Sequence, residues 1–432
     1  MTQKAGLRVP AGVSTEGDVM DRSRWSGRVV RTAWSLAAIL LIPAAGLVVS
    51  AGTASAITPI GPPVTDPPVV GIGGITAGGS HSCALLTQLE SVRCWGSNSN
   101  GQLGTMNTTD ADRAKIVIEL GGATAVAAGS AHTCALLNNK TVKCWGKNSS
   151  GQLGVGTTTS TTFPLMAVTG LSNVTAISAG ANHTCARLMD KTVKCWGDNS
   201  SGQLGNNSLN NATTPVSVSG LSDVSAIAAG GNHTCARKSD RTVKCWGANG
   251  SGQLGNNTTT NSKVPVAVSG ITTANTITAG DTHSCVVLTD KTARCWGGNG
   301  SGQLGNNSTT NAKVPVTVSG LTTATAVDAG GAHSCARLDD STVRCWGSNT
   351  RGQLGNNSTT NAKVPVTVQS ISTATAITTG GAQSCALLSD STEKCWGSNT
   401  KGQLGIGNTI DQKKPNLAVT FTSFVCPDCA IN

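Results

Sequence analysis

The sequence predicts an all-β protein, a seven-bladed β-propeller of four-stranded antiparallel blades, and three observations support this prediction. Cys-Trp-Gly recurs with its tryptophans 50 or 51 residues apart, at Trp95, Trp145, Trp196, Trp246, Trp296, Trp346 and Trp396. Each interval reads as four short strands separated by turns, with no helical periodicity. The composition, with 53 Gly, three Phe and no Tyr, favours short strands joined by turns over helices.

The fourth interval shows the strands most clearly. VSAIAAG (224–230), HTCARK (233–238), TVKCWG (242–247) and VPVAVSG (264–270) are short apolar or alternating segments, and a long Gly/Asn/Thr loop separates the last two. A fixed period of this length indicates units that cannot bury their apolar faces alone. A linear β-solenoid is the alternative, but its repeats are usually about 20–30 residues long. A closed ring of blades also leaves only short, protected edges.

The cysteine spacing predicts one disulfide in each unit. In HTCARLMDKTVKCWG the turn centres on Asp190, so Cys185 and Cys195 oppose each other on neighbouring strands, within reach of a disulfide. The predicted pairs are Cys83–Cys94, Cys134–Cys144, Cys185–Cys195, Cys235–Cys245, Cys285–Cys295, Cys335–Cys345 and Cys385–Cys395. The first turn is one residue longer, which is expected to shift its register slightly. Each tryptophan points away from its cysteine and is expected to pack between blades.

The N-terminal 56 residues have the order of a secretory signal. Arg22, Arg24, Arg28 and Arg31 precede the apolar run LAAILLIPAAGLVV (36–49), and small residues lead to a cleavage site after Ala56. Either Met1 or Met20 fits as the start, and no Arg-Arg pair is present, so the general secretory route is expected. A retained membrane anchor is the alternative, which the shortness of the run and its Pro43 disfavour. A Pro-rich linker (57–70), the propeller (71–421) and a tail (422–432) follow.

The tail contains Cys426 and Cys429 in a C-x-x-C. Because no second pair accompanies it, a local disulfide is favoured over zinc or redox chemistry.

The charge distribution argues against nucleic acid as a partner. The formal net charge is +10, but the lysines and arginines are scattered singly, with no run beyond Lys413-Lys414. A nucleic-acid-binding protein normally concentrates its basic residues in one patch. The sequence therefore predicts a solvated, mildly basic surface on a monomer that contacts membrane only if its N-terminal segment is retained.

No residue set predicts catalysis, a cofactor or a metal. Six histidines precede the first cysteine of a unit by two residues, at His81, His132, His183, His233, His283 and His333, and Gln383 takes this place in the seventh. Glutamine replaces histidine better as a hydrogen bonder than as a metal ligand, so a bond to the adjacent Gly-rich turn is expected. G-Q-L-G lacks the G-K-[ST] of a phosphate loop, and its leucine is expected to fill a gap between blades.

The motifs AG-x-x-H, W-G-x-N and G-Q-L-G, repeated over about residues 70–421, resemble the repeat of the regulator of chromosome condensation family. The resemblance implies a seven-bladed propeller but does not fix an activity. The family includes a nuclear exchange factor for a small GTPase, chromatin binders, ubiquitin-ligase modules and secreted bacterial proteins, and one secreted bacterial relative in fold inhibits β-lactamases. This chain departs from the nuclear member in its signal, its paired cysteines and its lack of an acidic exchange loop.

The function predicted is a secreted or cell-surface, non-enzymatic binding or scaffold module whose specificity lies where the repeats differ. An exchange-factor-like regulator, by family resemblance, and an extracellular enzyme inhibitor are the alternatives. The deviations are Gln88-Leu89-Glu90 and loop 105–115 in unit 1, loop 155–166 in unit 2, and Gln383, Glu393 and loop 406–414 in unit 7. A ring of small turn residues that is neutral apart from one charge is expected at one mouth of the channel: Ser80, Ala131, Asn182, Asn232, Asp281, Thr282, Ala332 and Ala382. The candidate contact residues for an extracellular protein or glycan are Asp110, Arg113, Phe163, Met166, Asn182, Asn232, Asp281 and Asp411.

Overall fold

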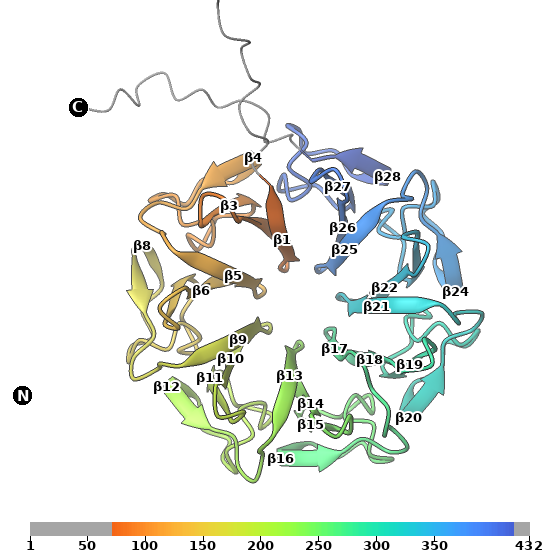
Figure 1. The fold of residues 1–432 in the computed structure, drawn as a ribbon, viewed down its shortest axis with the longest axis horizontal. Helices are drawn as coiled ribbons and strands as arrows, with labels where there is room; N and C mark the ends of the chain where they lie inside the picture. Colours follow the sequence, from red (N-terminus) through yellow and green to blue (C-terminus); the bar gives the residue numbers. More distant parts are fainter. Residues whose placement is uncertain (1–70, 419–432) are drawn as a thin grey trace, which may run out of the picture. The chain divides into compact units, whose positions relative to one another are not determined.

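The computed structural model describes residues 71–418, except that the side chains of residues 162–164 lie outside the description. The described chain forms 28 strands in seven four-stranded antiparallel sheets arranged around a central opening, which confirms the predicted seven-bladed propeller (Figure 1). The signal segment, Ala56, the linker, Cys426 and Cys429 lie outside the described residues. Residues 71–418 include no helix long and apolar enough to cross a membrane.

Each blade uses four consecutive strands, with the first nearest the axis. The strands of the first three blades are β1 (Ile72–Ala77), β2 (His81–Leu86), β3 (Ser91–Gly96) and β4 (Ala111–Ile116); β5 (Ala123–Ala128), β6 (His132–Leu137), β7 (Val142–Gly146) and β8 (Thr161–Ala167); β9 (Val174–Ala179), β10 (His183–Leu188), β11 (Val193–Gly197) and β12 (Ala212–Ser217).

The last four blades repeat this order. Their strands are β13 (Val224–Ala229), β14 (His233–Lys238), β15 (Val243–Gly247) and β16 (Ser262–Ala267); β17 (Thr278–Ala279), β18 (His283–Val287), β19 (Ala293–Gly297) and β20 (Ala312–Thr317); β21 (Ala324–Ala329), β22 (His333–Leu338), β23 (Val343–Gly347) and β24 (Ala362–Thr367); β25 (Ala374–Thr379), β26 (Gln383–Leu388), β27 (Glu393–Gly397) and β28 (Gln412–Leu417).

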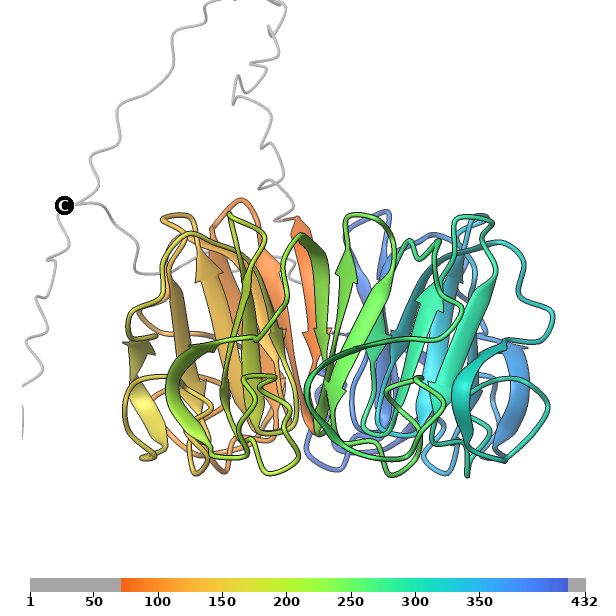
Figure 2. The ribbon, with the colours of Figure 1, turned by 90° about the horizontal axis from the view of Figure 1, so that it is seen from below.

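The two ends of this disc carry different connections (Figure 2). Because the strands are antiparallel, the turns after each first strand and the long loops after each third strand share one end, which we call the loop face. The turns after each second strand and the linkers between blades share the other end, the hairpin face. β1 starts and β28 ends at the hairpin face, so the described chain enters and leaves the disc on the same side.

A disulfide joins the second and third strands of every blade, as predicted. Cys185 and Cys195 are directly paired, and so are the other six pairs, with Cα atoms 4.0–4.1 Å apart. This short separation is characteristic of a non-hydrogen-bonded antiparallel pair. The longer first turn does not shift the register, since Cys83 still faces Cys94.

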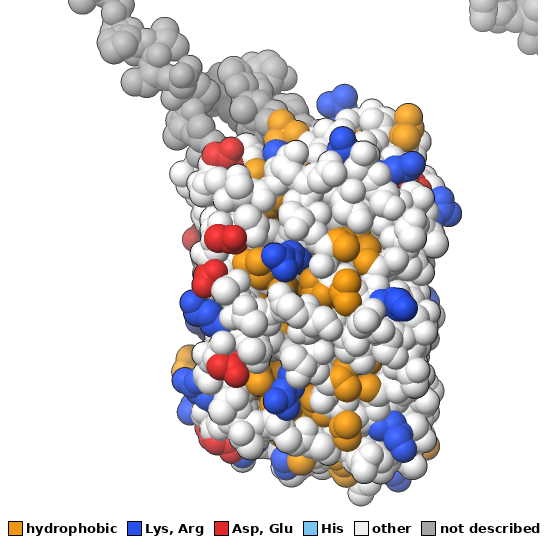
Figure 3. Space-filling view, turned by 90° about the vertical axis from the view of Figure 1, so that its right-hand side faces the viewer, with side chains coloured by type: hydrophobic (Ala, Val, Ile, Leu, Met, Phe, Trp, Pro, Cys, Tyr) orange, Lys and Arg blue, Asp and Glu red, His pale blue; other side chains and the backbone are white. Residues whose placement is uncertain are grey.

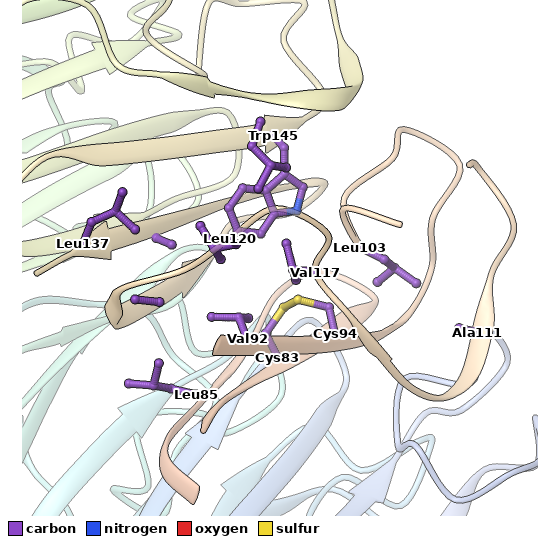
Figure 4. Close-up of a cluster of buried hydrophobic side chains, with 13 residues drawn as sticks. Cys83, Leu85, Val92, Cys94, Leu103, Ala111, Val117, Leu120, Leu137 and Trp145 are labelled. Atoms are coloured by element: carbon purple, nitrogen blue, oxygen red, sulfur yellow. A yellow bond between two sulfur atoms is a disulfide. The ribbon is translucent and has the colours of Figure 1, made fainter. Parts of the chain in front are cut away.

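The core lies between blades, where the disulfide of one blade faces the tryptophan of the next. Trp145 of blade 2 packs with Cys83 and Cys94 of blade 1 in one buried cluster (Figure 4). All seven tryptophans are at most 1% exposed, and each indole Nε1 donates to the glutamine carbonyl of the preceding G-Q-L-G at 2.8–3.0 Å. The G-Q-L-G leucines are also fully buried, as expected. Disulfide, indole and leucine therefore form one repeated interface.

Two glycines of the repeat are required by close approaches. In Cys-Trp-Gly the strand bulges at the tryptophan, and the glycine takes a φ of 101–106°, which side chains rarely adopt. The last glycine of G-Q-L-G lies against the next tryptophan, so a Cβ at Gly205 would come within 2.7 Å of Trp246 Nε1. These approaches explain why both motifs recur in every blade.

Blades 7 and 1 close the ring without sharing a strand. β1 and β28 belong to separate sheets. The structure adds hydrogen bonds equivalent to those at the other junctions: Trp95 Nε1 and Ser82 Oγ both donate to the Gln403 carbonyl, at 3.0 and 2.9 Å. The seventh junction therefore shares the tryptophan and hydroxyl bonds of the other six.

Candidate functional site: the loop face

The central opening of the loop face is built from backbone. A ring of seven hydrogen bonds runs from blade to blade at 3.0–3.3 Å, from Gly79 N to Gly129 O and onward to Gly381 N and Gly78 O. The described residues that line the opening are Gly, Ala, Ser and Thr, with Asp281 as the one charged member. This composition offers no set of unlike catalytic groups around the axis.

The channel wall below the opening carries hydroxyls that join neighbouring blades. Ser178 Oγ accepts from Ala229 N at 2.9 Å, and threonines take the same part at Thr76, Thr278 and Thr378. Asp328 occupies this position in blade 6, where it accepts from Thr379 N at 2.7 Å and from the Thr278 hydroxyl at 2.9 Å. Burial raises the pKa of Asp328 above its usual range, and these hydrogen bonds oppose that rise. Asp328 therefore holds neighbouring blades together.

The repeated histidines bind the next blade, not the adjacent turn as expected. His183 Nε2 lies 2.9 Å from Thr234 Oγ1, and that hydroxyl donates to the Gln203 carbonyl, so the imidazole must donate. All six histidines are fully buried, and burial lowers their pKa values to about 3–4. Gln383 donates instead to the Gly78 carbonyl at 3.0 Å. These neutral side chains hold adjacent blades together.

A buried asparagine organises every long loop, and this role was not predicted from the sequence. In Trp-Gly-x-Asn, Asn249 Oδ1 accepts from Leu254 N at 2.9 Å, and its Nδ2 donates to the Thr258 and Thr260 carbonyls. The equivalent asparagines 98, 148, 199, 299, 349 and 399 are also fully buried. Their recurrence three residues after each tryptophan was the available signal. The loops are therefore held in a defined shape.

Asp110 and Asp411 replace an asparagine of these loops. Asp110 Oδ1 accepts from Asn98 N at 2.7 Å, as Asn211 Oδ1 does from Asn199 N at 2.9 Å. Asp411 Oδ1 accepts from Asn399 N, also at 2.7 Å. Each carboxylate also pairs with a cation of the preceding blade: Lys401–Asp110 at 3.1 Å and Arg351–Asp411 at 3.2 Å. Both aspartates, which were predicted as contact residues, thus link long loops of neighbouring blades.

The deviating loops of blades 7 and 1 meet across the ring closure. Gly407 N donates to the Asp112 carbonyl at 2.9 Å, and a Cβ at Gly407 would touch the Arg113 guanidinium. Two large apolar side chains stand exposed on these loops, Met106 at 52% and Ile410 at 68%. We call Met106, Arg113 and Ile410, with loops 105–115 and 406–414, the closure patch.

The other candidate contact residues are dispersed. Asn182 Oδ1 accepts from Lys147 Nζ at 3.1 Å, whereas Asn232 and Asp281 are exposed near the opening. Met166 is 37% exposed on the outer strand β8, and the Phe163 side chain lies outside the described part of the structure.

Three deviating segments cannot join the closure patch. The Gln88-Leu89-Glu90 turn lies on the hairpin face, where Glu90 Oε2 accepts from Asn138 Nδ2 at 3.2 Å. Gln383 and Glu393 are buried, at 0% and 3% exposure. Gln383 therefore belongs to a blade junction and Glu393 to the core of blade 7. The residues of blade 7 that differ from the other repeats and face solvent are those of its long loop.

Glu393 takes a position that is apolar in the other six blades. Its Oε1 lies 3.2 Å from Cys395 Sγ, and its Oε2 has no hydrogen-bond partner among the described residues. Burial raises the pKa of Glu393 to about 8. The atoms of Cys385, Glu393 and Cys395 are close enough together to hold a metal ion, but the two sulfurs are joined in a disulfide and so offer no thiolate.

The fold and its loop face define a protein class: a rigid, disulfide-stapled propeller that displays loops. Residues 49–336 match the RCC1-like domain model, and residues 324–353 and 340–387 match models of the regulator of chromosome condensation (RCC1) repeat. The first match covers more than half of the sequence, so the chain belongs to the RCC1-like family, as its repeats suggested.

Solved structures with the same fold come from distant organisms. Yeast RCC1 (Prp20), bound to Kap60, is 18% identical with a TM-score of 0.70, over 82% of this chain and 86% of that one. Human WBSCR16 is 21% identical with a TM-score of 0.66, over 72% and 84%. The entire ectodomain of the Physcomitrella patens receptor kinase CR4 is 20% identical with a TM-score of 0.50, over 76% and 74%. At these identities the likeness establishes the fold alone.

Proposed function

We propose that this protein is a secreted or cell-surface binding propeller, without enzymatic activity, that contacts an extracellular protein or glycan through the closure patch. The observation that carries the proposal is the meeting of the two deviating loops of blades 7 and 1, each of which exposes a large apolar side chain, Ile410 on one and Met106 on the other. Exposed apolar side chains held on a rigid support are typical of binding sites.

Two features support an extracellular location. Seven disulfides, one per blade, suit an oxidising compartment. The CR4 relative is a receptor ectodomain, which shows that this fold occurs outside cells.

Binding of proteins is also known for the fold. The yeast relative has been crystallised with Kap60 and studied for its binding to Gsp1p and histones. None of these partners transfers to a chain at about 20% identity. These relatives support the proposal only in that a rigid propeller can serve as a binding platform.

The test replaces exposed residues of the closure patch by those of the regular repeats. Met106→Asn with Ile410→Thr introduces the residues that blades 4 to 6 carry at these loop positions, and Leu209→Thr removes a comparably exposed apolar side chain from blade 3. We expect a binder captured from secreted or cell-wall fractions by the intact protein and by Leu209→Thr to bind the double variant at least about tenfold more weakly. Equal capture by all three proteins would contradict the closure patch, and substrate turnover or nucleotide release from a GTPase would contradict the binding class.

A further inference from the structure

The outer wall of the disc gathers cations that the sequence scatters. The third and fourth strands of the blades carry fourteen lysines and arginines: Arg93, Arg113, Lys115, Lys143, Lys194, Lys244, Lys263, Arg294, Lys313, Arg344, Lys363, Lys394, Lys413 and Lys414. The only carboxylates on these strands are Asp112 and the buried Glu393. The basic residues are scattered along the sequence, but folding brings many of them together on the outer wall of the disc.

Eleven of these cations form two tiers. The tier nearer the hairpin face comes from the third strands, where Lys394 Nζ donates to the Ser370 carbonyl of a linker at 3.2 Å. The tier nearer the loop face comes from the start of the outermost strands of blades 4 to 7, at Lys263, Lys313, Lys363 and Lys413. Figure 3 shows Lys and Arg side chains standing on the wall, with most of the carboxylates along one edge.

The tier nearer the loop face is electrostatically uncompensated. All four of its lysines are exposed, and none takes part in the five ion pairs of the described residues. Those pairs use lysines and arginines of the two faces, such as Lys191 with Asp223 and Lys291 with Asp339. Positive potential is therefore concentrated on the wall, while the faces are largely balanced.

The shape and chemistry of the wall select its ligand. The wall lysines of blades 4 to 7 stand on four different blades, so a ligand that reaches all of them must be a long chain that touches several blades at once. Between the lysines stand the apolar side chains of Val264, Val314 and Val364, each 37% exposed, which suit the C–H faces of sugar rings. Lysines are point charges without the planar fork that selects bidentate anions, so they suit mobile acidic groups.

The same features disfavour nucleic acid. All seven repeat tryptophans are buried, so the described wall offers no aromatic platform for unstacked bases. A duplex is stiff over about 150 base pairs and would need to bend sharply to follow so small a disc.

We propose that the wall of blades 4 to 7 binds a linear acidic polysaccharide through Lys263, Lys313, Lys363 and Lys413. The choice of a polysaccharide rests on the extracellular location proposed above, whereas the wall itself is separate from the closure patch. Each bound acidic group displaces a counterion, so binding weakens with salt in proportion to the number of contacts.

The test compares two quartets that remove the same charge. K263Q/K313Q/K363Q/K413Q alters the wall, and K140Q/K191Q/R241Q/K291Q alters the hairpin face. Binding of the intact protein to labelled polygalacturonate is measured between 50 and 200 mM salt, beside a DNA duplex of matched charge. We expect the wall quartet to bind at least tenfold more weakly, with a salt slope shallower by about 3 because each lost contact removes about 0.7–0.9. The hairpin quartet and M106N/I410T should stay within about threefold of the parent.

Four results would overturn the proposal: no binding of polygalacturonate by the parent, equal losses in both quartets, an unchanged salt slope, or tighter binding of the duplex. Lysines and prolines on outer strands also discourage edge-to-edge aggregation. If the wall quartet variant aggregates in size-exclusion chromatography yet binds polygalacturonate like the parent, protection against aggregation alone accounts for the lysines. Because M106N/I410T reports on the closure patch, failure of either proposal is distinguishable from failure of the other.

Discussion

Glu393 places a carboxyl group where the other blades bury Val92, Val142, Val193, Val243, Ala293 and Val343. Its pKa of about 8, against 4.5 in an unfolded chain, means that the folded state favours the proton. Ionisation therefore destabilises the fold as the pH rises from about 4.5 to 8.

We expect Glu393→Val to raise the free energy of unfolding by up to about 3 kcal/mol at pH 7 and by less than about 1 kcal/mol at pH 5, at about 1.4 kcal/mol for each pKa unit. Urea unfolding at both pH values measures this difference. Val343→Glu is the reciprocal control and should destabilise blade 6 with the same pH dependence. A gain from Glu393→Val that is equal at both pH values would contradict the assignment.

The buried histidines give the opposite pH dependence. Their folded pKa values of about 3–4 lie below the unfolded value of 6.5, so the unfolded state binds more protons and stability falls with decreasing pH below about 7. At pH 5.5 each histidine should cost about 1.4 kcal/mol relative to pH 7.5. His233→Gln, which copies Gln383, should reduce the loss between these pH values by that amount. Both proteins carry Glu393, so its effect cancels, and identical pH profiles would contradict the prediction.

The hairpin of each blade is the element that the sequence predicts best. Alternation and a turn centred on Asp190 place Cys185 opposite Cys195, and both facts are local. The direction of each tryptophan toward the preceding blade is not local, because it depends on how sheets stack around the ring. The hydrogen bonds of Asn249 are made within 11 residues, but they depend on the folded shape of the loop, which the sequence did not predict. The row of wall lysines was not predicted because its members are 50 residues apart in the sequence.

Removing one staple tests its contribution to a blade. Cys235→Ala with Cys245→Ala should lower the free energy of unfolding by about 2.5–3 kcal/mol, because a loop of this length loses that much closure entropy when linked. Urea unfolding measures the loss, and Cys285→Ala with Cys295→Ala should give the same value within about 1 kcal/mol. Losses below about 0.5 kcal/mol in both variants would show that the hairpins hold without their disulfides.

At the scale of the molecule, the junction that closes the ring keeps the tryptophan bond of the other junctions. Trp95 and Gln403 form across the closure the same bond that Trp246 and Gln203 form between blades 3 and 4. The sequence could not predict this, because it did not establish where one blade ends and the next begins.

A circular permutant tests this equivalence. New ends within linker 219–223, with a short linker joining residues 418 and 71, move the break between blades 3 and 4. We expect a free energy of unfolding within about 1 kcal/mol of an unpermuted chain of residues 71–418, since surface linkers tolerate such changes. Failure of the permutant alone to fold would show that the junction of blades 7 and 1 is special.

The central claim, an exported ring stapled blade by blade, is tested most directly by one mass measurement. Protein recovered from the culture fluid or cell surface of its native host is digested without reduction, and its N-terminus and linked peptides are identified. We predict a chain that begins near Ile57, with each cysteine of residues 83–395 joined to its partner ten or eleven residues away. A cytosolic protein that retains residues 36–49, with free thiols or bridges between different blades, would contradict the claim.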